Sequence, residues 1–170
     1  MWCGMDASAA EFDAFYQAHY SDLVAMSYAL VGDLAEAQDL VQEALCRAWR
    51  RWDAVASYDK PVAWVRRVAT NLASSRWRRL RVVRHHQRME RAADVPELSP
   101  DHVALVAALR ELPDMQRRAI VLHYVVDLPL TEVATELGVP VGTVKSWLHR
   151  GRAALAARLS DSFEEVTNRD

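Results

Sequence analysis

The sequence predicts an all-α protein built from two helical units, and three observations support this fold class. Glycine, which weakens helices because its backbone has the most freedom to lose, occurs at only 5 of 170 positions. Apolar residues recur at steps of three and four along most of the chain, which is the spacing of one buried helix face. A polar segment with two prolines, residues 84–100, interrupts this spacing as a linker would and separates units at 8–83 and 101–160.

The first unit is expected to be a bundle of three to four helices. An apolar stripe over 12–30 predicts its first helix, which Gly32 ends. Asp33 and Glu36 have the spacing of an N-cap and its acidic partner, so a second helix should follow. Pro61 suits the first turn of a third helix, because the N–H that proline lacks would have no helical partner there. The inner face of the second helix would carry Ala37, Leu40, Val41, Ala44, Leu45, Ala48 and Trp52.

The second unit is expected to be a four-helix domain that ends in a helix-turn-helix. Thr131 can cap a short helix, and Gly138 directly after that helix tolerates the left-handed backbone that a tight turn requires. A further helix starts near Gly142 and would turn Val144 and Leu148 inward, together with Leu155. This layout leaves the other side of the last helix free to enter a major groove.

The free side of that last helix carries donors suited to DNA. Lysine and arginine reach guanine edges and phosphates, and a helix start offers N–H groups to a phosphate. The same spacing also fits an ordinary helical hairpin with a solvated polar face, so spacing alone does not decide between the two. The donors and their polar neighbours are Thr143, Lys145, Ser146, His149, Arg150 and Arg152.

Composition and charge exclude several classes of protein. No apolar run approaches the roughly 18 residues that a membrane span needs, and residues 1–10 lack the pattern of a secretory signal, so we expect neither. Two cysteines are too few for a disulfide framework and favour a reduced, cytoplasmic setting. The formal net charge is −2, yet residues 61–91 hold nine arginines against one glutamate, which fits a polyanionic partner or a solvated arginine-rich face.

The sequence offers no candidate for catalysis, for a metal or for a cofactor. It has neither a glycine-rich phosphate loop nor a nucleophile elbow. His85 and His86 lie in the linker and do not have metal-ligand spacing with Cys3 or Cys46. His123 lies in an apolar run and is expected to be a core or interface histidine. We therefore predict a protein that is not an enzyme and has no small-molecule substrate.

Three stretches of the sequence contain motifs that point to a family. Residues 130–152 contain LTEVA, LGVP, GTVKS and LHRGR. Residues 37–49 contain AQDLVQEA and RAW, and residues 61–73 read PVAWVRRVATNLA before Arg78-Arg79. The first set resembles region 4, and the second resembles region 2, of the sigma-70 family of RNA polymerase sigma factors, in particular its extracytoplasmic-function, sigma-E-like branch. The two regions occur in the family's order and cover nearly the whole chain.

The resemblance implies a dissociable specificity subunit that binds core RNA polymerase and directs promoter-specific initiation. The β′ clamp helices would bind Asp39, Gln42 and Glu43, whose carboxylates and amide suit an arginine-rich surface but also fit a solvated face. Residues of the loop 55–60 and of the third helix would open the −10 element: Tyr58, Trp64, Arg66, Arg67, Asn71, Arg78 and Arg79. The −35 element would be read by Lys145, Ser146, His149 and Arg150, with Thr143 and Arg152 beside them.

The resemblance also implies further partners and a location. The second unit would dock on the β flap, and an anti-sigma factor would restrain the chain. The protein would be cytoplasmic, and nucleoid-associated when in the holoenzyme. Three positions depart from the family. Trp147 stands where relatives usually have arginine, and Gly151 stands where they usually have alanine. Ser75 lies near the position at which relatives carry a second amide side chain. We expect Gly151 to weaken its helix by up to about 1 kcal/mol relative to alanine.

Two other functions fit the same residues. A regulator could bind operator DNA by itself through the helix-turn-helix and use its N-terminal bundle for a ligand or for dimerisation. An interaction module could sequester a protein partner without touching DNA, although the basic third helix argues against this. A sigma factor differs from both because specific initiation would require core polymerase.

Overall fold

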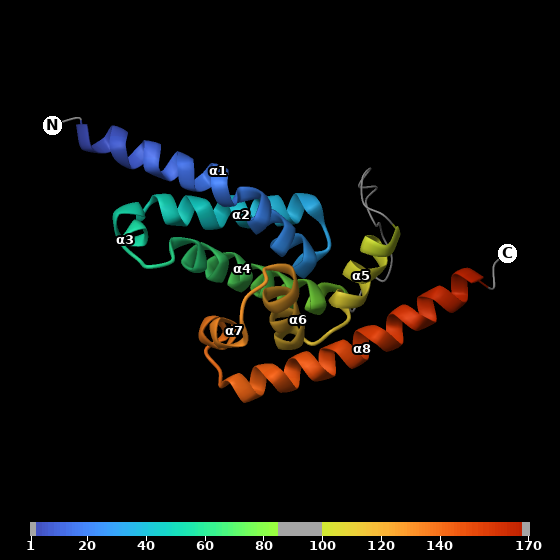
Figure 1. Cartoon of the computed structure of the whole chain (residues 1–170). Coiled ribbons are helices and arrows are strands. Elements are labelled where there is room, and N and C mark those ends of the chain that lie inside the picture. Colours follow the sequence, from blue (N-terminus) through green and yellow to red (C-terminus); the bar gives the residue numbers. More distant parts are fainter. Residues whose placement is uncertain (1–2, 85–99, 168–170) are drawn as a thin grey trace.

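The computed structural model describes the backbone of residues 3–84 and 100–167 and the side chains of residues 8–76 and 102–160. Every regular element in this part of the chain is a helix, which confirms the all-α prediction (Figure 1). The elements are α1 (Cys3–Val31), α2 (Leu34–Trp49), α3 (Trp52–Ala56), α4 (Pro61–Arg84), α5 (Pro100–Arg110), α6 (Asp114–Ile120), the π-helical turn η1 (Val121–Val125), α7 (Leu130–Leu137) and α8 (Val141–Thr167).

Helices α1 to α4 form the N-terminal bundle. The Asp33 carboxylate accepts a hydrogen bond from the backbone N–H of Glu36 at 2.8 Å and so caps α2, as predicted. Pro61 begins α4, also as predicted. The predicted inner face of α2 is buried, but Trp52 does not continue it. After α2 the chain turns at Arg50 and Arg51, and Trp52 opens the short helix α3 with its side chain in the core.

Helices α5 to α8 form the C-terminal unit. Val133 of α7 and Val144 of α8 are fully buried, and Gly138 between these helices has φ +67°, the left-handed conformation that the sequence predicts. Thr131 does not cap α7, so that expectation is wrong. Pro129 has the extended conformation of a helix-preceding residue, so α7 begins at Leu130 and Thr131 lies within its first turn.

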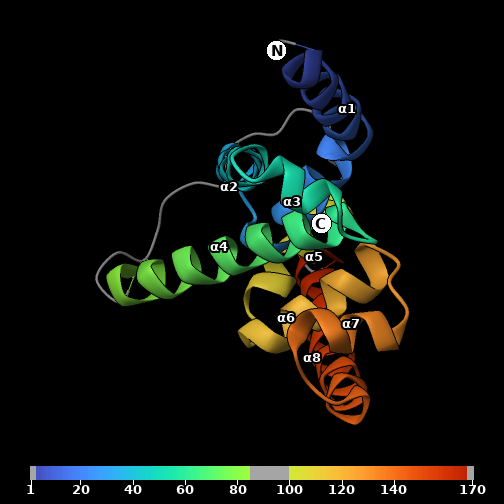
Figure 2. The ribbon, with the colours of Figure 1, turned by 90° about the vertical axis from the view of Figure 1, so that its left-hand side faces the viewer.

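The two units pack against each other, although the linker between them suggested separate units. Figure 2 shows α6, α7 and the start of α8 beneath α4, and the buried apolar residues of both units form one continuous cluster. The turn after α1 approaches α5 so closely that a Cβ at Gly32, which has φ +75°, would lie 2.5 Å from Cδ of Arg110. Gly32 therefore serves two purposes, the left-handed turn and the close contact between units.

Candidate polymerase and nucleic-acid interfaces

The acidic residues predicted for polymerase binding lie together on the outer side of α2. Asp39 and Gln42 are exposed and Glu43 is half-buried, because the opposite side of α2 packs into the bundle. The Glu43 carboxylate accepts a hydrogen bond from Arg47 one turn later. Exposed pairs of this kind contribute little to stability. A partner can therefore contact two carboxylates and an amide on this face without disturbing the packing of the core.

An apolar groove, which no sequence pattern predicted, adjoins this acidic face. The groove has a volume of about 590 Å³ between α1 and α2, and its lining includes Phe12, Tyr16, Gln42 and Trp49. The Trp49 side chain is 46% exposed although its ring lies 5.0 Å from that of Phe12. Burial, reinforced by the neighbouring Tyr20, raises the pKa of Tyr16. The signal in the sequence that could have pointed to the groove is Trp49, an aromatic residue directly after the inner-face residue Ala48.

The residues predicted for the −10 element are distributed along α4 and the loop before it. Tyr58 is exposed in that loop, and Arg67 is exposed on α4. Trp64 is half-buried and packs against the core, so its side chain contributes to the packing of the bundle. The side chains of Arg78 and Arg79 lie outside the part of the chain that the structure describes. Of these residues, Tyr58 and Arg67 are exposed to solvent, whereas Arg66 and Asn71 contact the C-terminal unit.

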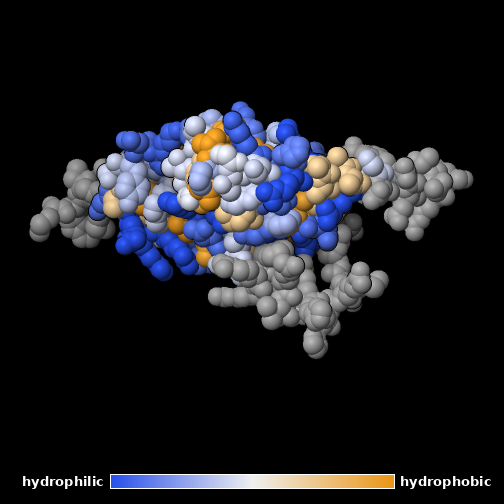
Figure 3. All heavy atoms as spheres, turned by 90° about the horizontal axis from the view of Figure 1, so that it is seen from below, coloured by the Kyte–Doolittle hydropathy of each residue, from blue (hydrophilic) through white to orange (hydrophobic). Residues whose placement is uncertain are grey.

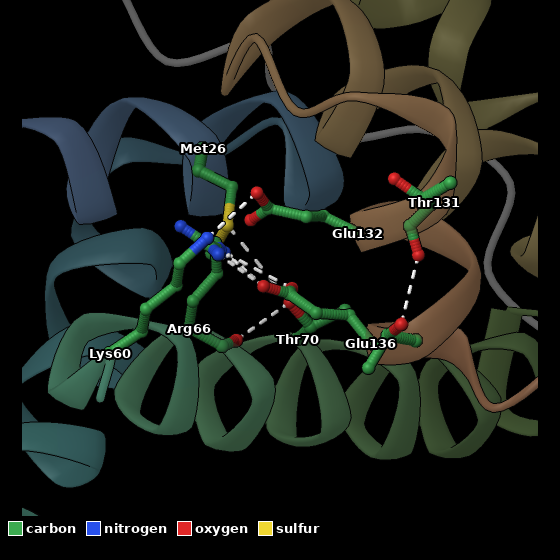
Figure 4. Close-up of polar contacts among 8 residues, drawn as sticks. Met26, Lys60, Arg66, Thr70, Thr131, Glu132 and Glu136 are labelled. Carbon is green, nitrogen blue, oxygen red and sulfur yellow. Dashed lines mark hydrogen bonds and ion pairs between the residues drawn. The ribbon is translucent and has the colours of Figure 1, made fainter. Parts of the chain in front are cut away.

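Arg66 is held by the C-terminal unit. Its guanidinium forks onto the Glu136 carboxylate, with Nε 2.9 Å from Oε1 and 3.1 Å from Oε2 and with Nη2 also bonded to Oε1. The two side chains are 8% and 11% exposed. Beside them the Lys60 ammonium donates to Glu132 at 2.7 Å, so two cations from the α4 side meet two carboxylates of α7 (Figure 4).

Two more polar contacts join α4 to α6. Arg118 donates to the Asn71 side-chain oxygen at 3.1 Å, and the Ser74 hydroxyl donates to Asp114 at 3.0 Å. Asp114 also accepts from Arg117 at 3.1 Å, although Arg117 is only 1% exposed. Burial lowers the pKa of the Arg117 guanidinium, and the negative charge of Asp114 opposes that shift. Residues 66 and 71, both predicted to touch DNA, thus have partners within the chain.

The predicted DNA-reading side of the helix-turn-helix is accessible. Lys145, Ser146, His149, Arg150 and Arg152 are exposed on α8, and Thr143 is half-buried. The inward-facing residues are buried as predicted, so the donors stand on the opposite side of the helix. Figure 3 views the molecule from below, where α8 lies, and shows hydrophilic side chains over much of that surface between smaller apolar patches.

The two departures within α8 have structural consequences. Trp147 is half-buried and packs against the core rather than standing free beside the donors. Gly151 is buried where α8 crosses α6, and a Cβ there would lie 2.4 Å from Cδ1 of Ile120. The expected helix-weakening effect of Gly151 is therefore accompanied by a packing requirement that the sequence did not reveal.

Nδ1 of His123 lies 2.7 Å from the Leu128 carbonyl oxygen, so this half-buried histidine has a hydrogen-bond partner. The described residues contain no group of three or more metal-ligating side chains. Among the described helices, none is long and apolar enough to cross a bilayer. His85 and His86 lie outside the described residues.

Comparison with known proteins agrees with this geometry. The family described as "Sigma-70 region 2" matches residues 15–83, and "Sigma-70, region 4" matches residues 102–155. The chain is 34% identical over 163 residues to an RNA polymerase sigma-E factor of Streptomyces avermitilis, an alignment that covers 94% of this chain and 87% of that protein. The chain belongs to the sigma-70 family. This sigma factor is also 32% identical, over 80% of its length and 82% of the relative's, to the ECF RNA polymerase sigma factor SigW of Bacillus subtilis.

The fold of this sigma factor resembles solved structures of relatives. The sigma factor RpoE of Bartonella quintana, solved in complex with the anti-sigma factor NepR, matches with a TM-score of 0.73 and 29% identity over 88% of this chain and 97% of that chain. The extracytoplasmic function sigma factor SigJ of Mycobacterium tuberculosis matches with a TM-score of 0.61 and 26% identity over 84% of this chain and 52% of that one. Both matches are too long to lie within one of the two units. Because a relative named as an ECF sigma factor matches most of the chain, the chain belongs to the extracytoplasmic-function branch of the family.

Proposed function

We propose that this sigma factor binds core RNA polymerase through α2, opens the −10 promoter element with α4 and reads the −35 element with α8. The observation that carries the proposal is that one chain presents an exposed acidic face on α2 and an exposed set of donors on α8, within units that match regions 2 and 4. A specificity subunit needs both surfaces, whereas a self-sufficient DNA-binding regulator needs only the second. The functional units are 8–83 and 101–160, joined by the linker 84–100.

Each surface has a chemical reason for its partner. Asp39 and Glu43 stand one turn apart with Gln42 between them, and they suit the guanidinium groups of an arginine-rich clamp. Lys145 and Arg150 are exposed donors that can reach guanine edges and phosphates in a major groove. Arg66 and Arg67 would bind the phosphates of the opened strand, and Tyr58 and Trp64 would stack on unpaired bases.

The proposal extends to control and location. The B. quintana relative was solved with an anti-sigma factor, and we infer that a comparable protein restrains this chain by covering its polymerase-binding faces. The C-terminal unit would also dock on the β flap. The protein would act in the cytoplasm, at the nucleoid when bound to polymerase, as a specificity subunit that performs no chemistry of its own.

The decisive experiment is run-off transcription from fragmented genomic DNA of the source organism, with the 5′ ends of transcripts sequenced. Purified core polymerase is assayed alone, with this chain and with a variant that carries Asp39→Lys and Glu43→Lys. Transcripts should start at a shared set of sites only when the unmodified chain is present. If the same 5′ ends appeared without the chain, the proposed function would be wrong. A mobility shift of duplex fragments by the protein alone would instead favour an operator-binding regulator.

A further inference from the structure

A pocket with no part in the proposed function lies where α2 ends and α3 begins. It has a volume of about 620 Å³ and is enclosed by this turn and by the start of α1. Pockets that hold small ligands have volumes of about 300–1,000 Å³, so a small molecule fits this one. Its polar and aromatic lining residues are Ser8, Trp49, Arg50, Arg51, Trp52 and Asp53.

Two adjacent cations in this pocket have no internal partner. Arg50 and Arg51 are exposed, and neither side chain forms an ion pair or a hydrogen bond within the described residues. The helix dipole favours arginine after a helix with or without a ligand, so the charge alone does not indicate a site. This pair differs because both side chains line one pocket. Their guanidinium groups provide the planar donors that bind phosphate oxygens in pairs.

Two tryptophans give the same pocket an aromatic wall. Trp49 is largely exposed, and its ring packs against Phe12, so it is a supported surface on which a planar ring can stack. Trp52 is only 5% exposed and is held by the rings of Phe12 and Phe15. The buried indole N–H of Trp52 has no acceptor among the described residues. A buried donor normally has a partner, and a ligand acceptor in the pocket would supply one.

We propose that this pocket binds a free nucleotide, with the base stacked on Trp49 and the phosphate held by Arg50 and Arg51. A nucleotide combines the two groups that the lining selects, which are a planar ring and an anion. Inorganic phosphate would leave the tryptophans unused, and an apolar ligand would leave the arginines unused. The Asp53 carboxylate, which accepts a hydrogen bond from Ser8 at 3.4 Å, repels phosphate. The base therefore lies toward Asp53, which can accept from an exocyclic amino group.

The position of the pocket favours a free nucleotide over one within a DNA strand. The proposed function places the opened strand on α4 and the loop 55–60. Figures 1 and 2 show α3 between the start of α1 and the start of α4, and the pocket lies on the α1 side of α3. A strand on α4 would have to pass around α3 to reach Arg50. A free nucleotide needs no such path.

Isothermal titration calorimetry of the full-length chain tests the proposal. ADP and GDP are titrated into the unmodified chain and into the variants Arg50→Gln, Arg51→Gln and Trp49→Leu. Arg47→Gln is the matched control, because it removes the same charge from an exposed position of α2 that does not line the pocket. Adenosine and inorganic phosphate test the two parts of the ligand separately. A short mixed-sequence single strand tests the alternative source of the nucleotide.

We expect saturable binding of one nucleotide per chain, tighter than that of adenosine or phosphate. Each substitution at Arg50 or Arg51 should weaken it about tenfold, because a hydrogen bond to a charged group is lost. Trp49→Leu should weaken it about fivefold or more through the loss of stacking. Arg47→Gln should change it by less than about twofold, because salt screens exposed charges that make no direct contact.

Absence of saturable binding, or an equal loss in Arg47→Gln and Arg50→Gln, would overturn the proposal. Binding of the single strand through these arginines without binding of ADP or GDP would overturn it as well, because the nucleotide would then belong to a strand. Should Trp49→Leu fail to fold, the two exposed arginine variants decide. Nucleotide binding needs neither polymerase nor a promoter, so this proposal and the proposed function can fail independently.

Discussion

The contact between α6 and α8 at Gly151 allows a stability prediction with a defined sign. A Cβ at this position would lie 2.4 Å from Cδ1 and 3.4 Å from Cγ1 of the buried Ile120. Carbon atoms pack at about 3.5–4.0 Å, so Gly151→Ala forces Ile120 out of its position. Overpacking costs about 1–3 kcal/mol, and the better helix propensity of alanine returns about 1 kcal/mol. The net expectation is a loss of about 1 kcal/mol.

The companion substitution Ile120→Val removes the atom that the new methyl group meets. Alone it should cost about 0.5–1.5 kcal/mol, because it leaves a small cavity. In combination, the methyl group introduced by Gly151→Ala fills that space, so the double variant should be about 1–2 kcal/mol more stable than the sum of the single effects. Urea unfolding followed by circular dichroism measures all three free energies of unfolding.

Gly142→Ala, also in α8, is the matched control, because a Cβ there meets no described atom within 4 Å. It should show only the gain in helix propensity. Strict additivity of the Gly151 and Ile120 effects, within about 0.5 kcal/mol, would refute the proposed close contact.

Three further predictions test two functional surfaces and the turn of the helix-turn-helix. The charge reversals Asp39→Lys and Glu43→Lys should together reduce the affinity for core polymerase at least about tenfold in anisotropy titrations. The circular dichroism spectrum should stay unchanged, because both side chains lie outside the core. An unchanged affinity would show that α2 is not part of the interface. Arg150→Ala should weaken promoter binding by the holoenzyme by about 1–3 kcal/mol and leave core binding intact, and an equal loss of core binding would contradict a DNA-reading role. Gly138→Ala should lower the free energy of unfolding by about 1–2 kcal/mol, because φ is +67° and the cost is backbone strain. Gly138→Asn should cost less, and equal costs for the two would argue against the left-handed turn.

Local patterns in the sequence predicted much of the fold, because they depend on neighbours within a few residues. The Asp33 cap, the start of α4 at Pro61 and the left-handed Gly138 all follow from local backbone chemistry and are all confirmed. The prediction that Thr131 caps α7 is wrong for a local reason as well, because Pro129, two residues earlier, is the residue that precedes the helix. A hydroxyl residue near a helix start was not sufficient evidence for a cap.

The arrangement of the two units could not be predicted in this way. The Arg66–Glu136 pair joins residues separated by 70 positions, and no periodicity links them. Glu132 and Glu136 are one turn apart on α7 and look from the sequence like a solvated acidic edge. Gly151 gives a similar lesson, since its role depends on which residue of α6 faces it. The linker composition suggested separate units, but composition carries no information on whether the units pack.

The placement of charge explains why α7 packs against the basic side of α4 rather than against α2. An interface that excludes water around a cation needs a nearby carboxylate, and α7 supplies two at the spacing of one helical turn. The acidic face of α2 would repel the same carboxylates. The donors of α8 belong to the same unit as these carboxylates but lie on another helix.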